Sequence, residues 1–187
     1  INGDAGNDSI YGDAGNDVID GGAGDDDLSG GDGNDTIDGF GGDDSLIGGA
    51  GDDTLDGGDG NEVMLGDGGN DQIDGGAGDD YMLGGLGDDR ITGGVGNDFL
   101  TGGAGVDTFT VASGIDTITD LGNGVDVLTV AAGSTANATL AAAWTAGATS
   151  INRGIENITT NGFATNLAAV VTAATNGFNV TNIGAAT

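Results

Sequence analysis

The segment Gly21-Gly22-Ala23-Gly24-Asp25-Asp26-Asp27-Leu28-Ser29 is one of twelve nine-residue units that follow one another without an insertion from residue 3 to residue 110. Positions 1 and 4 of the unit are Gly in all twelve copies, and position 6 is Asp in eleven and Glu62 in the other. Position 8 is always large and apolar, from Ile10 to Phe109. A period this strict is typical of a solenoid, in which each repeat stacks on its neighbours.

Each unit is expected to contain one turn and one short strand. The glycines of positions 1 to 6 permit positive φ angles and a tight turn. Positions 7 to 9 place one large apolar side chain between two outward-facing ones, because side chains alternate along a strand. A three-residue strand buries little by itself, so the stacked copies must share one apolar column.

The composition restricts the ligands and partners of the chain. It carries 31 acidic and 2 basic residues, a formal net charge of −29, with no His and no Cys. This charge excludes nucleic acid as a partner and disfavours an anionic membrane surface. Hard oxygen atoms are the available metal ligands, and these suit Ca²⁺ or Mg²⁺. Without His, Cys or a G-x-S-x-G motif, nothing indicates catalysis, and we expect the chain not to be an enzyme.

The unit resembles the RTX nonapeptide G-G-x-G-x-D-x-U-x of calcium-binding regions in large secreted bacterial proteins. The resemblance is close over residues 3–110 and loose over 111–130, where Asp116-Thr117-Ile118-Thr119 and Asp126-Val127-Leu128-Thr129 echo the end of the unit. It implies an all-β fold, a right-handed parallel β-roll of about six to seven coils with two units per coil. Turns would line both edges of the roll.

The resemblance also implies the calcium ligands. Between two stacked turns, one turn would supply the carbonyls of positions 2 and 4 and its position-6 carboxylate. The next turn would supply the carbonyls of positions 1 and 3 and its own position-6 carboxylate; one such pair is Asp26 and Asp44, and the next on that edge is Asp44 and Glu62. The expected carboxylate ligands are Asp8, Asp17, Asp26, Asp35, Asp44, Asp53, Glu62, Asp71, Asp80, Asp89, Asp98 and Asp107.

Glycine carbonyls are expected to complete these sites. Those of position 1 are Gly12, Gly21, Gly30, Gly39, Gly48, Gly57, Gly66, Gly75, Gly84, Gly93 and Gly102. Those of positions 2 and 3 are Gly22, Gly31, Gly41, Gly49, Gly58, Gly68, Gly76, Gly85 and Gly94. Those of position 4 are Gly24, Gly33, Gly51, Gly60, Gly78, Gly87 and Gly96.

The array has room for about ten Ca²⁺ ions, because six turns on each edge leave five gaps between them. Ten ions would nearly balance the repeat block, which holds 27 acidic residues and Arg90. Without a cation, the stacked carboxylates should repel one another and open the roll. The extra methylene of Glu62 is expected to shift or weaken the two sites that it shares with Asp44 and Asp80. Val106 at position 5 suggests that calcium binding fades at the end of the array.

The two outer faces of the roll differ in composition. The even-numbered units present mainly Thr and Asp, a hydrated face whose Thr residues alternate with Asp and so do not form the regular array of an ice-binding surface. The odd-numbered units become largely apolar from the fifth unit onward. A contiguous apolar patch marks an interface, so we expect these residues to be covered. The patch consists of Ile47, Val63, Leu65, Tyr81, Leu83 and Phe99. Three candidates could cover it: the C-terminal segment of the chain, another copy, or another part of a longer parent chain.

Two domains are expected. Residues 1–130 would form the roll, and residues 131–187, rich in Ala, Thr and Asn, a small and mostly β cap or linker. Within the second, 138–146 resembles a short helix, and 155–160, 167–172 and 178–183 resemble strands.

The expected function is that of a calcium-binding structural or interaction module, secreted and placed at a bacterial cell surface. A surface layer, a filament or an adhesin would be its setting, and binding of extracellular Ca²⁺ would drive its folding. The alternative is the RTX tail of a type I-secreted enzyme or toxin, which would have the same sequence features.

Overall fold

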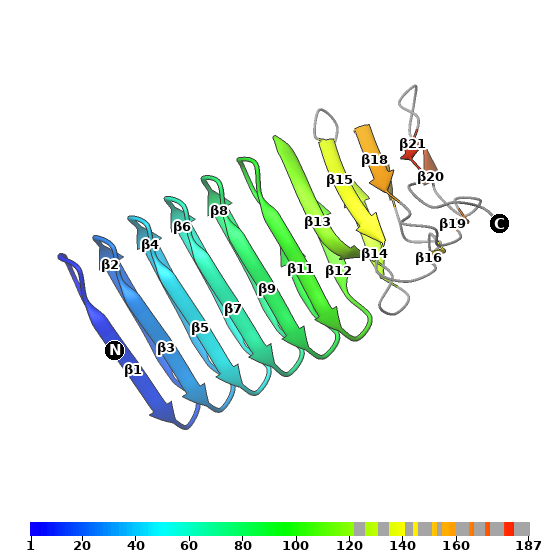
Figure 1. Cartoon of the computed structure of the whole chain (residues 1–187). Coiled ribbons are helices and arrows are strands. Elements are labelled where there is room, and N and C mark those ends of the chain that lie inside the picture. Colours follow the sequence, from blue (N-terminus) through cyan, green and yellow to red (C-terminus); the bar gives the residue numbers. More distant parts are fainter. Residues whose placement is uncertain are drawn as a thin grey trace.

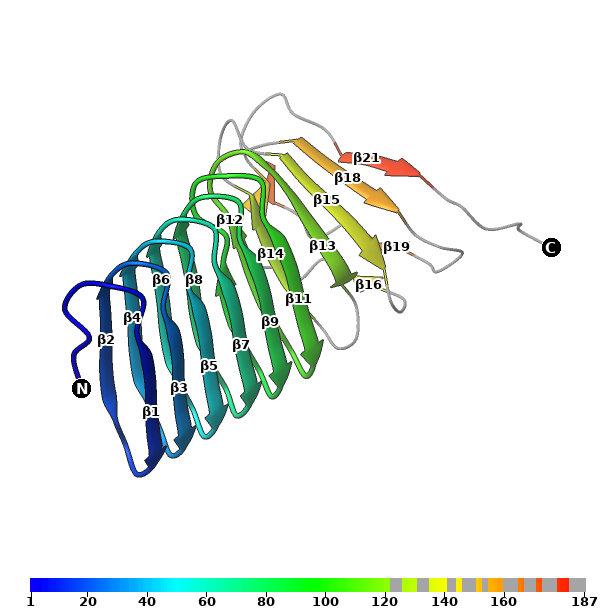
Figure 2. The ribbon, with the colours of Figure 1, turned by 60° about the vertical axis from the view of Figure 1, so that its left-hand side comes forward.

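Two parallel sheets run the length of the chain and face each other (Figures 1 and 2). The computed structural model describes residues 1–121 and 126–130, and beyond them the strands at 135–140, 144–145, 151–152, 155–159, 165–166, 171–172 and 178–181. The first sheet has the strand order β1-β3-β5-β7-β9-β11-β13-β15-β18-β21, and the second β2-β4-β6-β8-β10-β12-β14-β17-β20. From β1 to β15 the chain therefore crosses between these two sheets after every strand, which is the topology of a parallel β-solenoid. β16 and β19 form a separate two-stranded parallel sheet.

The strands of the regular repeats are nearly uniform in length. Their bounds are β1 Ser9–Ala14, β2 Val18–Ala23, β3 Asp27–Asp32, β4 Thr36–Gly41, β5 Ser45–Ala50, β6 Thr54–Asp59, β7 Val63–Gly68, β8 Gln72–Ala77, β9 Tyr81–Leu86, β10 Arg90–Thr92, β11 Phe99–Ala104 and β12 Thr108–Val111. Those that follow are β13 Ile115–Leu121, β14 Val127–Val130, β15 Thr135–Leu140, β16 Trp144–Thr145, β17 Ile151–Asn152, β18 Ile155–Thr159, β19 Thr165–Asn166, β20 Val171–Thr172 and β21 Phe178–Thr181.

Each coil of the roll contains two units, so equivalent residues stack 18 positions apart. Ile10 pairs with Leu28 in the first sheet, and Ile37 pairs with Leu55 in the second. All twelve position-8 side chains are buried, and the apolar column continues through Val111, Ile118, Leu121 and Leu128. The predicted parallel roll and its core are confirmed.

The strands are longer than the expected three residues. Most span six, from position 7 through position 3 of the next unit, with positions 8 and 1 both facing inward, as Leu28 and Gly30 do in β3. The ladder can continue because position 1 is Gly, which leaves room inside the roll for the side chain of position 6. The predicted strand ended at position 9 because the Gly-rich residues after it are typical of a turn.

Five of the strands beyond residue 131, β15, β17, β18, β20 and β21, extend the same two sheets. β15 pairs with β13, β18 with β15, and β21 with β18, all in parallel. The helix expected over 138–146 is wrong where the chain is described, since 138–140 belong to β15 and 144–145 form β16. Pairing with β13 outweighs the helical preference of Ala. The predicted strands are found in part, as β18, β20 and β21. The boundary near residue 130 stays a prediction.

The described part of the chain contains no helix with the length and apolar character that a membrane span requires.

Candidate calcium sites

The position-6 carboxylates form two buried columns, one along each edge of the roll. We call the column of Asp8, Asp26, Asp44, Glu62, Asp80, Asp98 and Asp116 the first edge, and that of Asp17, Asp35, Asp53, Asp71, Asp89, Asp107 and Asp126 the second edge. From Asp26 onward these side chains are at most 3 % exposed. Burying so many like charges is costly unless a cation or a proton compensates them.

Backbone hydrogen bonds hold one oxygen of nearly every carboxylate. The position-6 amide of one turn donates to the Oδ1 of the position-6 Asp in the next turn on the same edge, at 2.8–3.1 Å. Asp26 N–H, for example, donates to Asp44 Oδ1 at 2.8 Å. Each carboxylate therefore reaches back toward the preceding coil, and we call this series the position-6 ladder.

The second oxygen of these carboxylates is buried and has no hydrogen-bond partner. This holds for the Oδ2 atoms of Asp8, Asp17, Asp26, Asp35, Asp44, Asp53, Asp71, Asp80, Asp89, Asp98 and Asp116, and for both carboxyl oxygens of Glu62. A buried polar atom without a partner is rare in a stable protein and calls for an unseen ligand. Because every such atom here is a carboxyl oxygen, its natural partner is a proton or a metal cation.

Glycine at position 1 makes room for this oxygen. A methyl group on Gly21 would lie 2.6 Å from Asp26 Oδ2 and 3.2 Å from the carbonyl oxygen of Gly39, which is position 1 of the next turn. The free carboxylate oxygen and a backbone carbonyl thus lie close together at each turn. This is a suitable environment for a hard cation such as Ca²⁺.

Burial raises the pKa of several of these carboxyl groups. The pKa of Asp53 and of Asp89 rises to about 6, and that of Asp98 and of Asp107 to about 7. Desolvation is the main cause in each case, and neighbouring carboxylates on the same edge add to it. Compact packing of both edges therefore favours protons or a metal on the carboxylates.

Side chains alone do not make a metal site in the part of the chain that is described. No group of three or more His, Cys, Asp or Glu side chains is close enough there to hold an ion. Each ion would need backbone carbonyls beside its carboxylates, as the expected ligand set has it. Coordination mainly by neutral and anionic oxygen suits Ca²⁺, which accepts six to eight oxygen ligands in flexible geometry.

A family model for the RTX calcium-binding nonapeptide repeat matches four times, at residues 1–28, 21–55, 56–91 and 83–118. The chain belongs to this family. A search of curated proteins found no match. The resemblance predicted from the repeat is therefore confirmed, and the RTX array is a calcium-binding module. The number of ions and the identity of their backbone ligands stay predictions.

The RTX array contains a second ladder that the sequence did not predict. The Oδ1 of Asn or Asp at position 5 accepts a hydrogen bond from the position-5 amide of the next turn on its edge, at 2.7–3.2 Å. This direction is opposite to that of the position-6 ladder, so side chains from both turns join each pair of coils. The recurrence of Asn or Asp at position 5, from Asn7 to Asn97, was the available signal.

Two further carboxylates belong to the RTX edges. Asp98 N–H donates to Asp116 Oδ1, and Asp107 N–H donates to Asp126 Oδ1, both at 3.0 Å. The echoes Asp116-Thr117 and Asp126-Val127 indicated this, but the second pair lies 19 residues apart rather than 18. Val106 and Ile115 occupy position 5 in this region, so their apolar side chains cannot continue the position-5 ladder.

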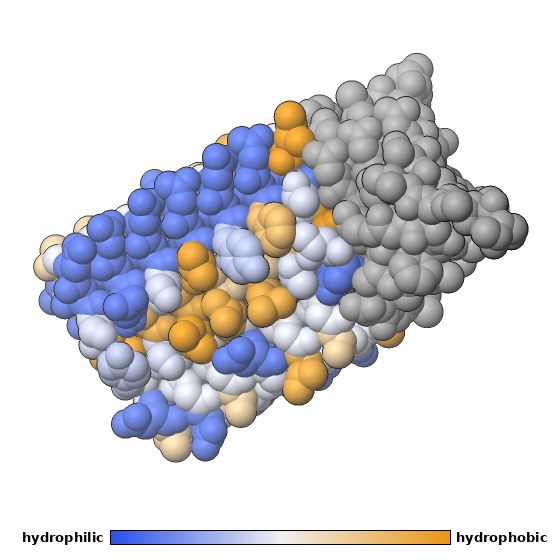
Figure 3. Space-filling model, viewed as in Figure 1, coloured by the Kyte–Doolittle hydropathy of each residue, from blue (hydrophilic) through white to orange (hydrophobic). Residues whose placement is uncertain are grey.

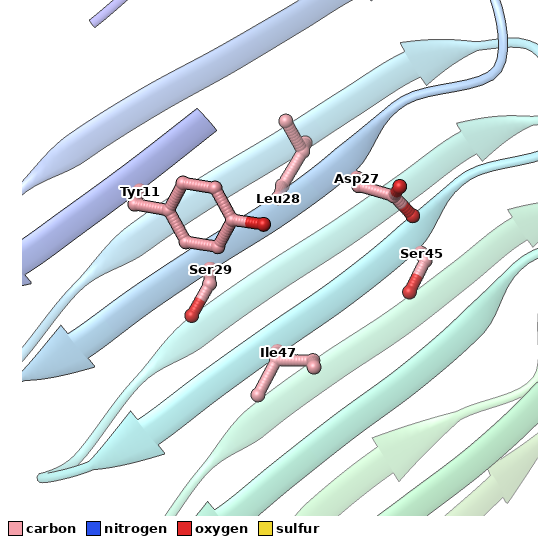
Figure 4. Close-up of a pocket in the computed structure, with 6 residues that line it drawn as sticks. All are labelled: Tyr11, Asp27, Leu28, Ser29, Ser45 and Ile47. Carbon is pink, nitrogen blue, oxygen red and sulfur yellow. The ribbon is translucent and has the colours of Figure 1, made fainter. Parts of the chain in front are cut away.

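The six residues predicted as an interface lie together on the outer face of the first sheet, where Figure 3 shows apolar side chains between hydrophilic edges. We call them the apolar face. The rings of Tyr81 and Phe99 stack with their centroids 5.1 Å apart, yet remain 46 % and 36 % exposed. On the same sheet toward β1, a shallow hollow lies between Tyr11 and Ile47 and is also lined by Asp27, Leu28, Ser29 and Ser45 (Figure 4).

Replacing one position-6 acid should remove calcium without breaking the ladder. In Asp53→Asn, the amide oxygen can still accept from Asp35 N–H, but an NH₂ group replaces the free Oδ2. We expect about two fewer bound ions, since each carboxylate is expected to serve two gaps. Asp52→Asn is the matched control, because the Asp52 side chain accepts hydrogen bonds only from Asn70 and Asn occupies position 5 in other units. Isothermal titration calorimetry gives both stoichiometries; equal values would contradict the assignment.

Proposed function

We propose that this chain is a calcium-binding structural and interaction module of a secreted bacterial cell-surface protein, and that it folds when it meets extracellular Ca²⁺. The observation that carries the proposal is the pair of buried carboxylate columns, in which the second carboxylate oxygen has no hydrogen-bond partner at Asp26, Asp44, Asp53 and most other members. A surface layer, a filament or an adhesin is the setting we favour.

Coupling of folding to calcium follows from the charge of the chain. The unfolded chain has a net charge of −29 and keeps its carboxylates in water, whereas the roll buries two columns of them. Only a bound cation or a proton makes that burial favourable at neutral pH. Extracellular calcium modules bind with dissociation constants of roughly 10⁻⁴ to 10⁻³ M, which would keep the chain unfolded in the cytoplasm and fold it outside.

The RTX tail of a type I-secreted enzyme or toxin remains the second candidate. Its array would bind calcium and fold in the same way and would aid export. The two candidates differ in whether the folded module assembles. The apolar face favours assembly, because exposed aromatic and aliphatic side chains in one patch mark an interaction surface.

The partner of the apolar face is expected to come from outside the described strands. β15, β18 and β21 extend the first sheet edge to edge and leave Tyr81 and Phe99 exposed. We propose that another copy, or another part of the parent chain, packs against this face. The parts of residues 131–187 that lie outside the described strands are the remaining candidate.

Charge on the apolar face should block this packing. We expect Leu83→Asp to abolish any calcium-dependent rise in light scattering, because a desolvated carboxylate at an interface is strongly unfavourable. Thr92→Asp is the matched control, since Thr92 has the same position 9 on the opposite sheet, where Asp74 is its strand neighbour. Unchanged scattering in Leu83→Asp would rule out this face as the assembly surface.

A calcium titration followed by circular dichroism and light scattering tests the proposed function as a whole. The expected result is that β-structure appears only with calcium and that scattering then rises. β-structure without scattering would favour the secretion-linked tail. A β spectrum in calcium-free buffer at pH 7 would contradict calcium-driven folding.

A further inference from the structure

The position-6 ladder is interrupted at one step in the described part of the chain. On the second edge, every position-6 amide from Asp17 to Asp107 donates to the next carboxylate. On the first edge, the same holds for Asp8, Asp26, Glu62, Asp80 and Asp98. Asp44 alone has no such bond, and the residue that should accept it is Glu62.

The side chain of Glu62 is directed differently from those of the aspartates. It is 1 % exposed, and neither of its carboxyl oxygens accepts a hydrogen bond from a backbone amide. Its carboxyl group also lies beside that of Asp80, with which it can share a proton. Its Oε2 lies where an Asp Oδ2 would lie, since a methyl group on Gly57 would be 2.9 Å from Oε2 and 2.5 Å from the carbonyl oxygen of Gly75.

The other oxygen, Oε1, points to a different place. A methyl group on Gly60 would lie 2.5 Å from Oε1 and would also contact the carbonyl oxygen of Gly42. Gly42 is position 4 of the preceding turn on this edge, the turn of Asp44. The longer side chain therefore carries Oε1 past the Asp44 amide and toward the gap between the two turns.

The gap between the turns of Asp44 and Glu62 differs from the gaps between two Asp turns in the carboxylate oxygens that face it. At a regular step, the gap has one free Oδ2 from the first turn and an Oδ1 from the second turn that already accepts an amide hydrogen bond. At the Asp44–Glu62 step, Asp44 Oδ2 and Glu62 Oε1 are both free. An oxygen that accepts no hydrogen bond keeps its lone pairs available to a cation. Burial of two such oxygens is therefore more unfavourable without a cation, and the binding of a cation gains more free energy there.

The extra methylene of Glu62 was expected to weaken the sites that it shares, but the free oxygens at this step favour the opposite for the site with Asp44. Building on the proposed calcium function, we propose that the Asp44–Glu62 step is the highest-affinity calcium site of the first edge and the point from which that edge fills. The step lies in the fifth to seventh of the twelve units, near the middle of the array. Coils on both sides would then add to a calcium-bound centre, because each repeat contacts only its neighbours. The position-5 ladder is not interrupted at this step, because the backbone amide and the side-chain amide of Asn61 both donate to Asp43 Oδ1.

Glu62→Asp tests the assignment in the full chain. The shorter side chain should accept from Asp44 N–H, as Asp80 accepts from Glu62 N–H, and should no longer place a second free oxygen in the gap. We expect the affinity for the first ion, measured by calorimetry, to fall about tenfold. At saturating calcium, the Asp44 amide should exchange its hydrogen about tenfold more slowly than in the wild type, as a restored hydrogen bond requires.

Asp71→Glu is the matched variant on the second edge. It should free the Asp53 amide, which donates to Asp71 Oδ1 in the wild type, and create a second early-filling site there. Hydrogen exchange at one or two ions per chain should then show protection around both steps. Unchanged first-ion affinity in Glu62→Asp, or an Asp44 amide as protected in the wild type as that of Asp26, would overturn this inference. A wild-type chain that binds no calcium would instead overturn the proposed function.

Discussion

In calcium-free buffer, the roll should lose stability as the pH rises from about 4 to 8. Burial raises the pKa of Asp53 and Asp89 to about 6 and of Asp98 and Asp107 to about 7, and that of Glu62 to about 9. In the unfolded chain, these groups titrate near pH 4. Between these values the folded state binds more protons than the unfolded state, so the free energy of unfolding decreases as the pH rises. The stabilisation is complete below about pH 4. It is lost through pH 6 to 7 for the four aspartates and near pH 9 for Glu62.

Saturating calcium should reverse this dependence. Calcium binds the ionised carboxylates, so protons compete with it, and acidification should release the ions and lower the stability of the loaded roll. Urea denaturation followed by circular dichroism at pH 4, 6 and 8, with and without calcium, measures both trends. Light scattering at each pH serves as the control for aggregation of the nearly neutral chain at low pH. Stability that increases with pH in calcium-free buffer would show that the carboxylates are not buried as described.

Adding one methyl group at position 1 should disable a calcium site and destabilise the roll. In Gly48→Ala, the new methyl would lie 2.5 Å from Asp53 Oδ2 and 3.0 Å from the carbonyl oxygen of Gly66. Real Cβ contacts are longer than this, so the carboxylate and the next coil must move apart. We expect a loss of about 1–3 kcal/mol, the usual cost of overpacking, and at least one bound ion fewer.

Gly68→Ala is the control for this substitution. A methyl group there would meet only the carbonyl oxygen of Gly49, at 3.9 Å, and Gly68 does not have a positive φ. Ala already occupies the same position 3 at Ala23, Ala50, Ala77 and Ala104. Urea denaturation in saturating calcium should therefore give a wild-type midpoint for Gly68→Ala and a lower one for Gly48→Ala. Equal midpoints would mean that position 1 is glycine for its backbone freedom alone.

Most of the fold could be predicted because the repeat is local and strict. Position 8 showed which side chains form the core, and Leu28, Leu46 and Met64 are indeed buried there. Position 6 showed which acids would stack, and the columns that contain Asp26 and Asp53 confirm it. The helix expected at 138–146 failed because β13 and β15 pair in register, a contact that the local composition does not reveal.

Details of the sites could not be predicted because they depend on atoms 18 residues apart. The nine-residue pattern does not say that Oδ1 of Asp44 binds the amide of Asp26 while Oδ2 stays free. Nor does it say that Asn at position 5 reaches the next coil in the opposite direction. The one-residue insertion before Asp126 hid a member of the second edge for the same reason.

The sequence by itself therefore determined the period, the apolar column, the stacking of the position-6 acids and the family. Each of these is present in every unit and needs only the alternation of a strand and the turn-forming property of glycine. The tertiary structure decided which carboxylate oxygens are left for a cation, how far the columns extend, and that Glu62 interrupts one of them. These atoms lie close together only because the coils stack. At such short distances, the one extra methylene of Glu62 is enough to remove the hydrogen bond from the Asp44 amide.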